Sequence, residues 1–124
     1  MIKKIFITFV LFFCISAYAV EKETNFSIEI FEEAKASGKT FVINSYEVWC
    51  GTCSKQTKIL DKAKKEFKEI IFLSYEQSKN KDIAKKLNIK QWTTIVVYKG
   101  DNELSRIVGQ TDEEIIYAAI KKGI

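Results

Sequence analysis

A short apolar segment that leads directly into a pair of cysteines is the feature that most limits how this chain can fold. Residues 40–46 (Thr-Phe-Val-Ile-Asn-Ser-Tyr) are rich in β-branched and aromatic side chains, as expected of a strand buried on both faces. Cys50 lies four residues after the end of this segment, and Cys53 lies seven residues after it. Beyond them the apolar side chains recur at helical spacing, and they are Ile59, Leu60, Ala63 and Phe67. Lysines between Lys55 and Lys68 take the other side, so the segment predicts a strand, a cysteine-bearing turn and a long amphipathic helix.

The remaining apolar patterns predict further helices and strands in alternation. The expected elements are a helix over 26–37 that stops at Gly38, a strand over 70–75, a short helix over 79–87 and a hairpin of two strands over 94–98 and 103–108. A final helix begins near Thr111, whose hydroxyl is expected to cap it while Glu114 reciprocates. Its side chains expected to face the core are Ile115, Ile116, Ala119 and Ile120. This order of elements predicts an α/β protein, a three-layer α/β/α sandwich with a mixed central sheet.

The first 19 residues have the layout of a secretory signal peptide. Lys3 and Lys4 precede an apolar run over 5–15, and the small residues Ala17 and Ala19 fit cleavage after Ala19. The run is shorter than the ~20 residues that span a bilayer, although an uncleaved membrane anchor is the alternative. We therefore expect a periplasmic or secreted protein in which residues 1–19 are a signal peptide.

Residues 20–124 suit one domain with a single core. Cleavage would remove Lys3, Lys4 and Cys14 and lower the formal net charge from +4 to +2. Lysines are spread along the predicted helices and Arg106 is the one arginine, whereas nucleic-acid-binding proteins gather basic residues on one face. The composition argues against nucleic acid as a partner, and we expect a monomer.

Cys50 and Cys53 would then be the remaining cysteines, in a compartment where disulfides persist. A staple across so short a loop would constrain the unfolded chain little, so the pair indicates redox chemistry rather than scaffolding. At the start of a helix, unpaired N–H groups and the helix dipole stabilise a thiolate, which makes Cys50 the expected attacking sulfur at the exposed end. Cys53, one turn further in, is expected to resolve the mixed disulfide.

The absence of histidine limits the alternatives. A structural zinc ion needs four Cys or His ligands, which two cysteines cannot supply. A dimer that shares a metal ion or an iron–sulfur cluster through two cysteine pairs stays open, as does a binding module that holds clients without turnover. No small-molecule cofactor is expected, because the redox centre consists of the protein's own sulfurs.

The residues around the cysteines resemble the active site of the thioredoxin family. The segment 49–55 (Trp-Cys-Gly-Thr-Cys-Ser-Lys) is similar to the family's Trp-Cys-Gly-Pro-Cys-Lys, with Thr52 in place of the proline. The similarity in length and element order extends over the chain from about Phe26, including Ile-Val-Val-Tyr-Lys-Gly at 95–100. The resemblance implies a thioredoxin fold, an attacking Cys50 and a resolving Cys53. It also implies that Trp49 forms a flat apolar wall beside them, the alternative being simple core packing.

Two differences from the family's sequence affect how Cys53 loses its proton. The family's buried acid falls on Asn44, and its lysine partner is replaced by Ser74. The usual general base for Cys53 is therefore missing, so water or another group must accept the proton. Glu47 is the nearest carboxylate in the sequence, but a solvated loop carboxylate is the favoured interpretation of it.

A third departure lies in the loop before the hairpin, where Thr93 takes the place of the family's cis-proline. A cis bond before threonine costs ~3 to 4 kcal/mol, against ~0.5 to 1 before proline, so we expect a trans Trp92–Thr93 bond. In the family this loop grips the substrate and keeps metals off the cysteines, and both properties are put in doubt. The Thr93 hydroxyl is expected within reach of Cys50 as a hydrogen-bond donor. Trp92 is either a second apolar wall for substrates or a core residue.

Together these features predict an exported thiol:disulfide oxidoreductase that acts on protein thiols and disulfides outside the cytoplasm. A membrane electron donor is the expected partner. Reduction is favoured over oxidation, because the near-minimal domain lacks the large helical insertion that resembles a dedicated disulfide-introducing oxidase.

Overall fold

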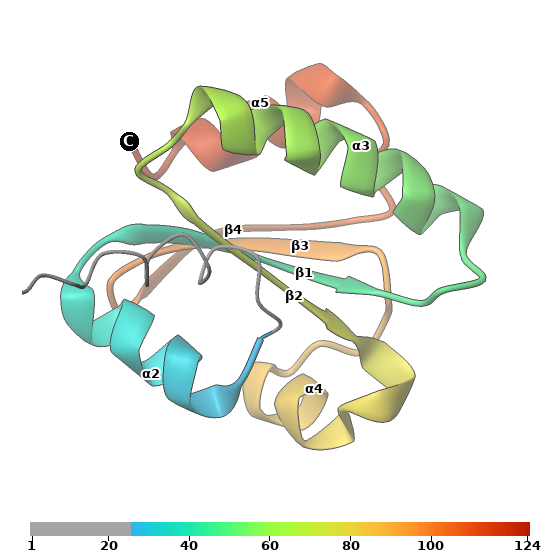
Figure 1. Cartoon of the computed structure of the whole chain (residues 1–124), viewed down its shortest axis with the longest axis horizontal. Helices are drawn as coiled ribbons and strands as arrows, with labels where there is room; N and C mark the ends of the chain where they lie inside the picture. The colour runs from blue at the N-terminus through green and yellow to red at the C-terminus, as the bar shows by residue number, and fades with distance from the viewer. Residues whose placement is uncertain (1–25) are drawn as a thin grey trace, which may run out of the picture.

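Four strands in the order β2-β1-β3-β4 form one sheet in the computed structural model, which describes residues 26–124 (Figure 1). The strands are β1 (Thr40–Tyr46), β2 (Ile71–Glu76), β3 (Thr94–Lys99) and β4 (Asn102–Val108). β1 runs parallel to β2 and antiparallel to β3, and β3 and β4 form the expected hairpin. The predicted mixed sheet is therefore confirmed.

Helices cover both faces of this sheet, which confirms the predicted three-layer α/β/α sandwich (Figure 1). α2 (Ile28–Ser37) and α4 (Lys81–Leu87) lie on one face, and α3 (Gly51–Glu66) and α5 (Glu113–Lys121) lie on the other. A short 3-10 helix, η1 (Gln77–Lys79), precedes α4. The predicted signal peptide, residues 1–19, lies outside the described residues. Within residues 26–124 no helix is long and apolar enough to cross a membrane.

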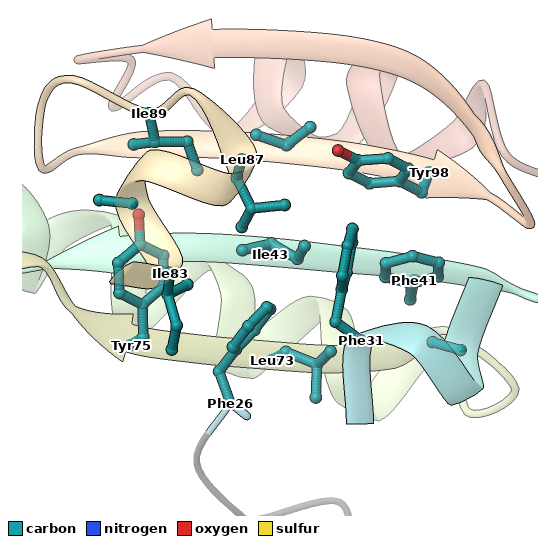
Figure 2. Close-up of a cluster of buried hydrophobic side chains, with 13 residues drawn as sticks. Phe26, Phe31, Phe41, Ile43, Leu73, Tyr75, Ile83, Leu87, Ile89 and Tyr98 are labelled. Atoms are coloured by element: carbon teal, nitrogen blue, oxygen red, sulfur yellow. The ribbon is translucent and has the colours of Figure 1, made fainter. Parts of the chain in front are cut away.

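The two central strands, β1 and β3, are buried on both faces because their side chains alternate between two buried clusters. On β1, Phe41 and Ile43 point towards α2 and α4, and Val42 points towards α3 and α5. The first cluster is drawn in Figure 2, where its labelled members are Phe26, Phe31, Phe41, Ile43, Leu73, Tyr75, Ile83, Leu87, Ile89 and Tyr98. The rings of Phe41 and Tyr98 stack there with their centroids 4.9 Å apart. Burial on both faces fixes the position of β1, whose end leads to the cysteines.

The ends of two helices differ from the sequence-based expectation. Ser27 caps α2 by accepting from the Ile30 N–H at 3.1 Å, so the helix begins at Ile28 and not at Phe26. Thr111 was the expected cap of α5, but Asp112 takes that position. The Asp112 carboxylate accepts from two backbone N–H groups of the first turn, and its charge favours the positive end of the helix.

The core-facing side of α5 is also narrower than expected. Ile116, Ala119 and Ile120 are buried, at the i, i+3 and i+4 spacing of one helical stripe. Ile115 was predicted to join them, but it is 43% exposed because its position in the first turn lies beside that stripe.

Arg106 on β4 fixes the end of α4, from which the chain leads to the loop that carries Trp92 and Thr93. Its guanidinium donates to the carbonyls of Asn88 at 3.1 Å and Leu87 at 3.0 Å. Glu103 holds the guanidinium in place through two hydrogen bonds of 2.8 and 2.9 Å. These bonds lower the pKa of Glu103 and raise the pKa of Arg106. The segment that follows Asn88 is therefore attached to the sheet at its start.

The assignment of Asp112 as the N-cap of α5 can be tested by mutation. Asp112→Ala removes the acceptor for two N–H groups and is expected to lower the free energy of unfolding by about 1 kcal/mol. Thr111→Ala, the matched control, should change it by less than about 0.5 kcal/mol. Urea unfolding followed by circular dichroism measures both. A larger loss from Thr111→Ala than from Asp112→Ala would restore Thr111 as the cap.

Candidate active site

Cys50 is the N-cap residue of α3, immediately after the loop that follows β1. Its backbone is extended (φ −93°, ψ 115°), and its Sγ accepts a hydrogen bond of 3.0 Å from the N–H of Cys53. A disulfide joins the two residues, whose Cα atoms are 5.2 Å apart. The predicted position of the pair at the start of the long helix is therefore confirmed. The sulfur of Cys50 lies where unpaired N–H groups and the helix dipole favour negative charge.

The burial of the two sulfur-bearing residues differs only slightly. Cys50 was predicted at the exposed end, yet it is 8% exposed, and Cys53 is 3% exposed. The side chain of Cys50 turns over the first turn of α3 to reach both the Cys53 N–H and the Cys53 sulfur, which covers it. Cys50 is still the more accessible of the two, as an attacking residue must be.

Two tryptophans form an exposed apolar surface beside Cys50. The ring of Trp49 meets that of Trp92 edge to face, with the centroids 5.0 Å apart and an interplanar angle of 75°. Trp49 is 66% exposed and Trp92 is 40% exposed, so neither is a core residue. Val48 next to them is 77% exposed. The two tryptophan rings contact each other and are not part of the hydrophobic core.

The loop that brings Trp92 to this place has the expected trans peptide bonds, with no cis bond among residues 26–124. Thr93 has φ +71°, a conformation that non-glycine residues seldom adopt and that costs about 1–3 kcal/mol. The hydroxyl of Thr93 was expected to face Cys50, but it donates to the carbonyl of Trp92 instead. With proline replaced, the chain passes this point through a positive φ and not through a cis bond.

Buried Ser45 on β1 holds this loop from the sheet side. Its carbonyl accepts from the Thr93 N–H at 2.9 Å, and its hydroxyl accepts from the Thr94 N–H at 3.2 Å. The same hydroxyl donates to the carbonyl of Gln91 at 3.0 Å. These bonds connect the loop to β1 on both sides of the unusual residue and offset its conformational cost.

Gln56 holds the loop from the helix side, and the sequence analysis missed it. Its side chain is fully buried on α3, and its Nε2 donates to the carbonyls of Thr93 at 3.1 Å and Gln110 at 2.9 Å. The Oε1 atom has no hydrogen-bond partner among residues 26–124, a condition that costs about 1–3 kcal/mol in a buried group. One signal was present in the sequence, because Gln56 interrupts the apolar stripe between Cys53 and Leu60.

Glu47 is buried, contrary to its interpretation as a solvated loop carboxylate. It is 4% exposed, and its two oxygens accept from the Ser78 N–H at 2.6 Å and the Ser78 hydroxyl at 2.9 Å. The cause is η1, which brings Ser78 against the loop after β1. Glu47 thus anchors the start of the cysteine loop, and the Cys50 N–H donates to its carbonyl at 3.2 Å.

Asn44 and Ser74 replace the family's buried acid and its lysine partner. They are paired neighbours on β1 and β2. Asn44 is 5% exposed and borders a cavity of about 230 Å³, to which Ser74, Thr57 and Asp61 also contribute. Two neutral side chains thus replace two opposite charges, which removes the desolvation cost of a buried pair.

Comparisons with known proteins agree with this geometry. The thioredoxin family model matches residues 17–122. A thioredoxin H-type of Fagopyrum esculentum is 32% identical over 72% of this chain and 77% of its own length. Thioredoxin-2 of Saccharomyces cerevisiae is 30% identical over 76% of this chain and 86% of its own length. The crystal structure of Trxlp from Edwardsiella tarda has the same fold, with a TM-score of 0.72 at 21% identity over 76% of this chain and 93% of that one.

The family match covers most of the chain, and the two cysteines lie at the helix start that disulfide exchange requires. The chain belongs to the thioredoxin family, and it is a thiol:disulfide oxidoreductase that carries a Cys50–Cys53 disulfide.

Proposed function

We propose that this protein is an exported reductase of protein disulfides. The observation that carries the proposal is the position of the Cys50 sulfur, which caps α3 and lies within a disulfide to Cys53. A sulfur so placed is stabilised as a thiolate when the pair is reduced, and the thiolate is the form that attacks a disulfide. The near-minimal domain and relatives named thioredoxin favour reduction over oxidation.

The reaction proceeds in two exchanges. The Cys50 thiolate attacks one sulfur of a substrate disulfide, forms a mixed disulfide and releases the other substrate sulfur as a thiolate. Cys53 then loses its proton and attacks the Cys50 sulfur, which breaks the mixed disulfide and releases the second substrate thiolate. The substrate gains two electrons, and the protein ends with the Cys50–Cys53 disulfide seen here. A membrane electron donor would reduce this disulfide again.

The surface beside Cys50 suits a segment of an unfolded or extended protein. Trp49 and Trp92 present flat apolar faces next to the attacking sulfur, and such anchors supply much of the binding energy at protein contacts. Thr93 lies between Trp92 and the sheet, so its backbone forms the base of the same surface. We assign substrate binding to these three residues.

Trapping experiments test the exchange reaction. Cys53→Ser keeps the attacking sulfur but cannot resolve the mixed disulfide, so covalent complexes with a disulfide-bonded protein such as insulin should accumulate. Cys50→Ser, the matched control, should give none and should lose reductase activity. Non-reducing electrophoresis and mass spectrometry detect the complexes. Complexes with neither variant, together with half an equivalent or more of iron or zinc in the wild type, would favour a metal-carrying dimer.

The tryptophan pair gives a second test. Trp92→Ala removes one ring of the surface and is expected to lower kcat/KM for protein disulfides about tenfold, or about 1.4 kcal/mol, with no change in reduction potential. Ile115→Ala, a matched exposed apolar residue on α5, should leave kcat/KM unchanged. An unchanged kcat/KM in the Trp92 variant would remove this ring from the binding surface.

Export is tested by the mass of the mature protein. The signal-peptide layout predicts that the protein isolated from the cell envelope or medium begins at Val20. The variant Ala19→Lys should block cleavage and leave the precursor attached to the membrane. A full-length wild-type protein in the cytoplasmic fraction would contradict export.

A further inference from the structure

Gln56, whose side-chain oxygen has no partner among residues 26–124, follows Cys53 by about one turn of α3. Gln56 is three residues after Cys53 on α3, so the two side chains project from the same side of the helix, one turn apart. Both are buried, Cys53 at 3% exposed and Gln56 at 0%. The amide nitrogen uses its two protons on the carbonyls of Thr93 and Gln110. In the disulfide form, the part of the chain that the structure describes offers no donor to Oε1.

Buried acceptors without a donor are rare in folded proteins, and each calls for a cause. A change of oxidation state supplies one. In the disulfide form neither sulfur carries a proton. Reduction by a dithiol transfers two electrons and breaks the S–S bond. Of the two protons that the dithiol loses, one goes to Cys53 and the other to solvent, so Cys50 becomes a thiolate and Cys53 a thiol, which is a hydrogen-bond donor. The donor that Oε1 lacks thus appears when the pair is reduced.

We propose that Gln56 Oε1 accepts a hydrogen bond from the Cys53 thiol in the reduced protein, and that Gln56 is thereby a positioning residue that favours the dithiol state. The bond exists in one redox state and not in the other, so it shifts the equilibrium towards the dithiol. It also keeps the thiol of Cys53 oriented until the mixed disulfide forms. The same amide holds the Thr93 loop, so the redox state of Cys53 is linked to the substrate surface.

This inference rests on the proposed function, because it requires a pair that cycles between dithiol and disulfide. The test is the equilibrium of wild type and variants in glutathione buffers. Gln56→Met has a similar volume but no acceptor, and we expect its equilibrium to move about tenfold towards the disulfide, which is about 30 mV. Ser45→Ala is the matched control, since it weakens the same loop from the β1 side without touching the acceptor. Its equilibrium should stay within about twofold of the wild type.

Two results of this titration overturn the proposal. One is an unchanged equilibrium in Gln56→Met, and the other is an equal shift in Ser45→Ala, which would reduce the role of Gln56 to loop support. A wild-type pair that does not titrate reversibly contradicts the proposed function itself and removes the basis of the inference.

A second measurement needs no variant and decides the matter if Gln56→Met fails to fold. The side-chain carbonyl carbon of Gln56 should move downfield in the NMR spectrum when the wild-type protein is reduced, because its oxygen gains a donor. Gln77 is the internal control, since its Oε1 accepts from the Tyr75 hydroxyl at 2.7 Å and its Nε2 donates to the Ile89 carbonyl at 3.0 Å in the disulfide form. Equal shifts at Gln56 and Gln77, or no shift at Gln56, would contradict the proposed bond.

Discussion

The backbone of Thr93 is held at a positive φ by hydrogen bonds from β1, from α3 and from the end of β4, and the active site depends on this hold. Its N–H donates to Ser45, and its carbonyl accepts from Gln56 at 3.1 Å and from the Gly109 N–H at 2.9 Å. Without these bonds a threonine would leave the left-handed region, which few side chains tolerate. Trp92 would then move with it and separate from Trp49. The proposed substrate surface thus depends on hydrogen bonds made by buried residues.

In this protein neutral polar side chains occupy the positions at which the family has a buried ion pair, and they hold the loop that contains a proline in the family. Ser45 and Gln56 fix the loop by hydrogen bonds, and Asn44 with Ser74 replaces a buried ion pair. A neutral network avoids the cost of burying charge, but each member must find its partners. Among residues 26–124 the side-chain oxygen of Gln56 is the exception, and we have proposed the reduced Cys53 thiol, one helical turn away, as its donor.

The sequence was sufficient for features that depend on local pattern. The strand at Thr40–Tyr46 has the predicted bounds, the cysteines begin the predicted helix, and the peptide bond before Thr93 is trans. Glu47 could not be placed in the same way, because its burial depends on Ser78, 31 residues further along the chain. The role of Gln56 likewise depends on Gln110, 54 residues away. Thr111 and Asp112 are both good caps, and the packing of α5 decides between them.

We propose above all that Cys50 and Cys53 form a reversible redox pair that reduces protein disulfides. The reduction potential of the wild-type pair tests it most directly. On the scale of related proteins we expect a reversible two-electron titration at about −270 mV. A value near about −120 mV would assign the protein to disulfide formation, and the absence of reversible titration would contradict the claim altogether.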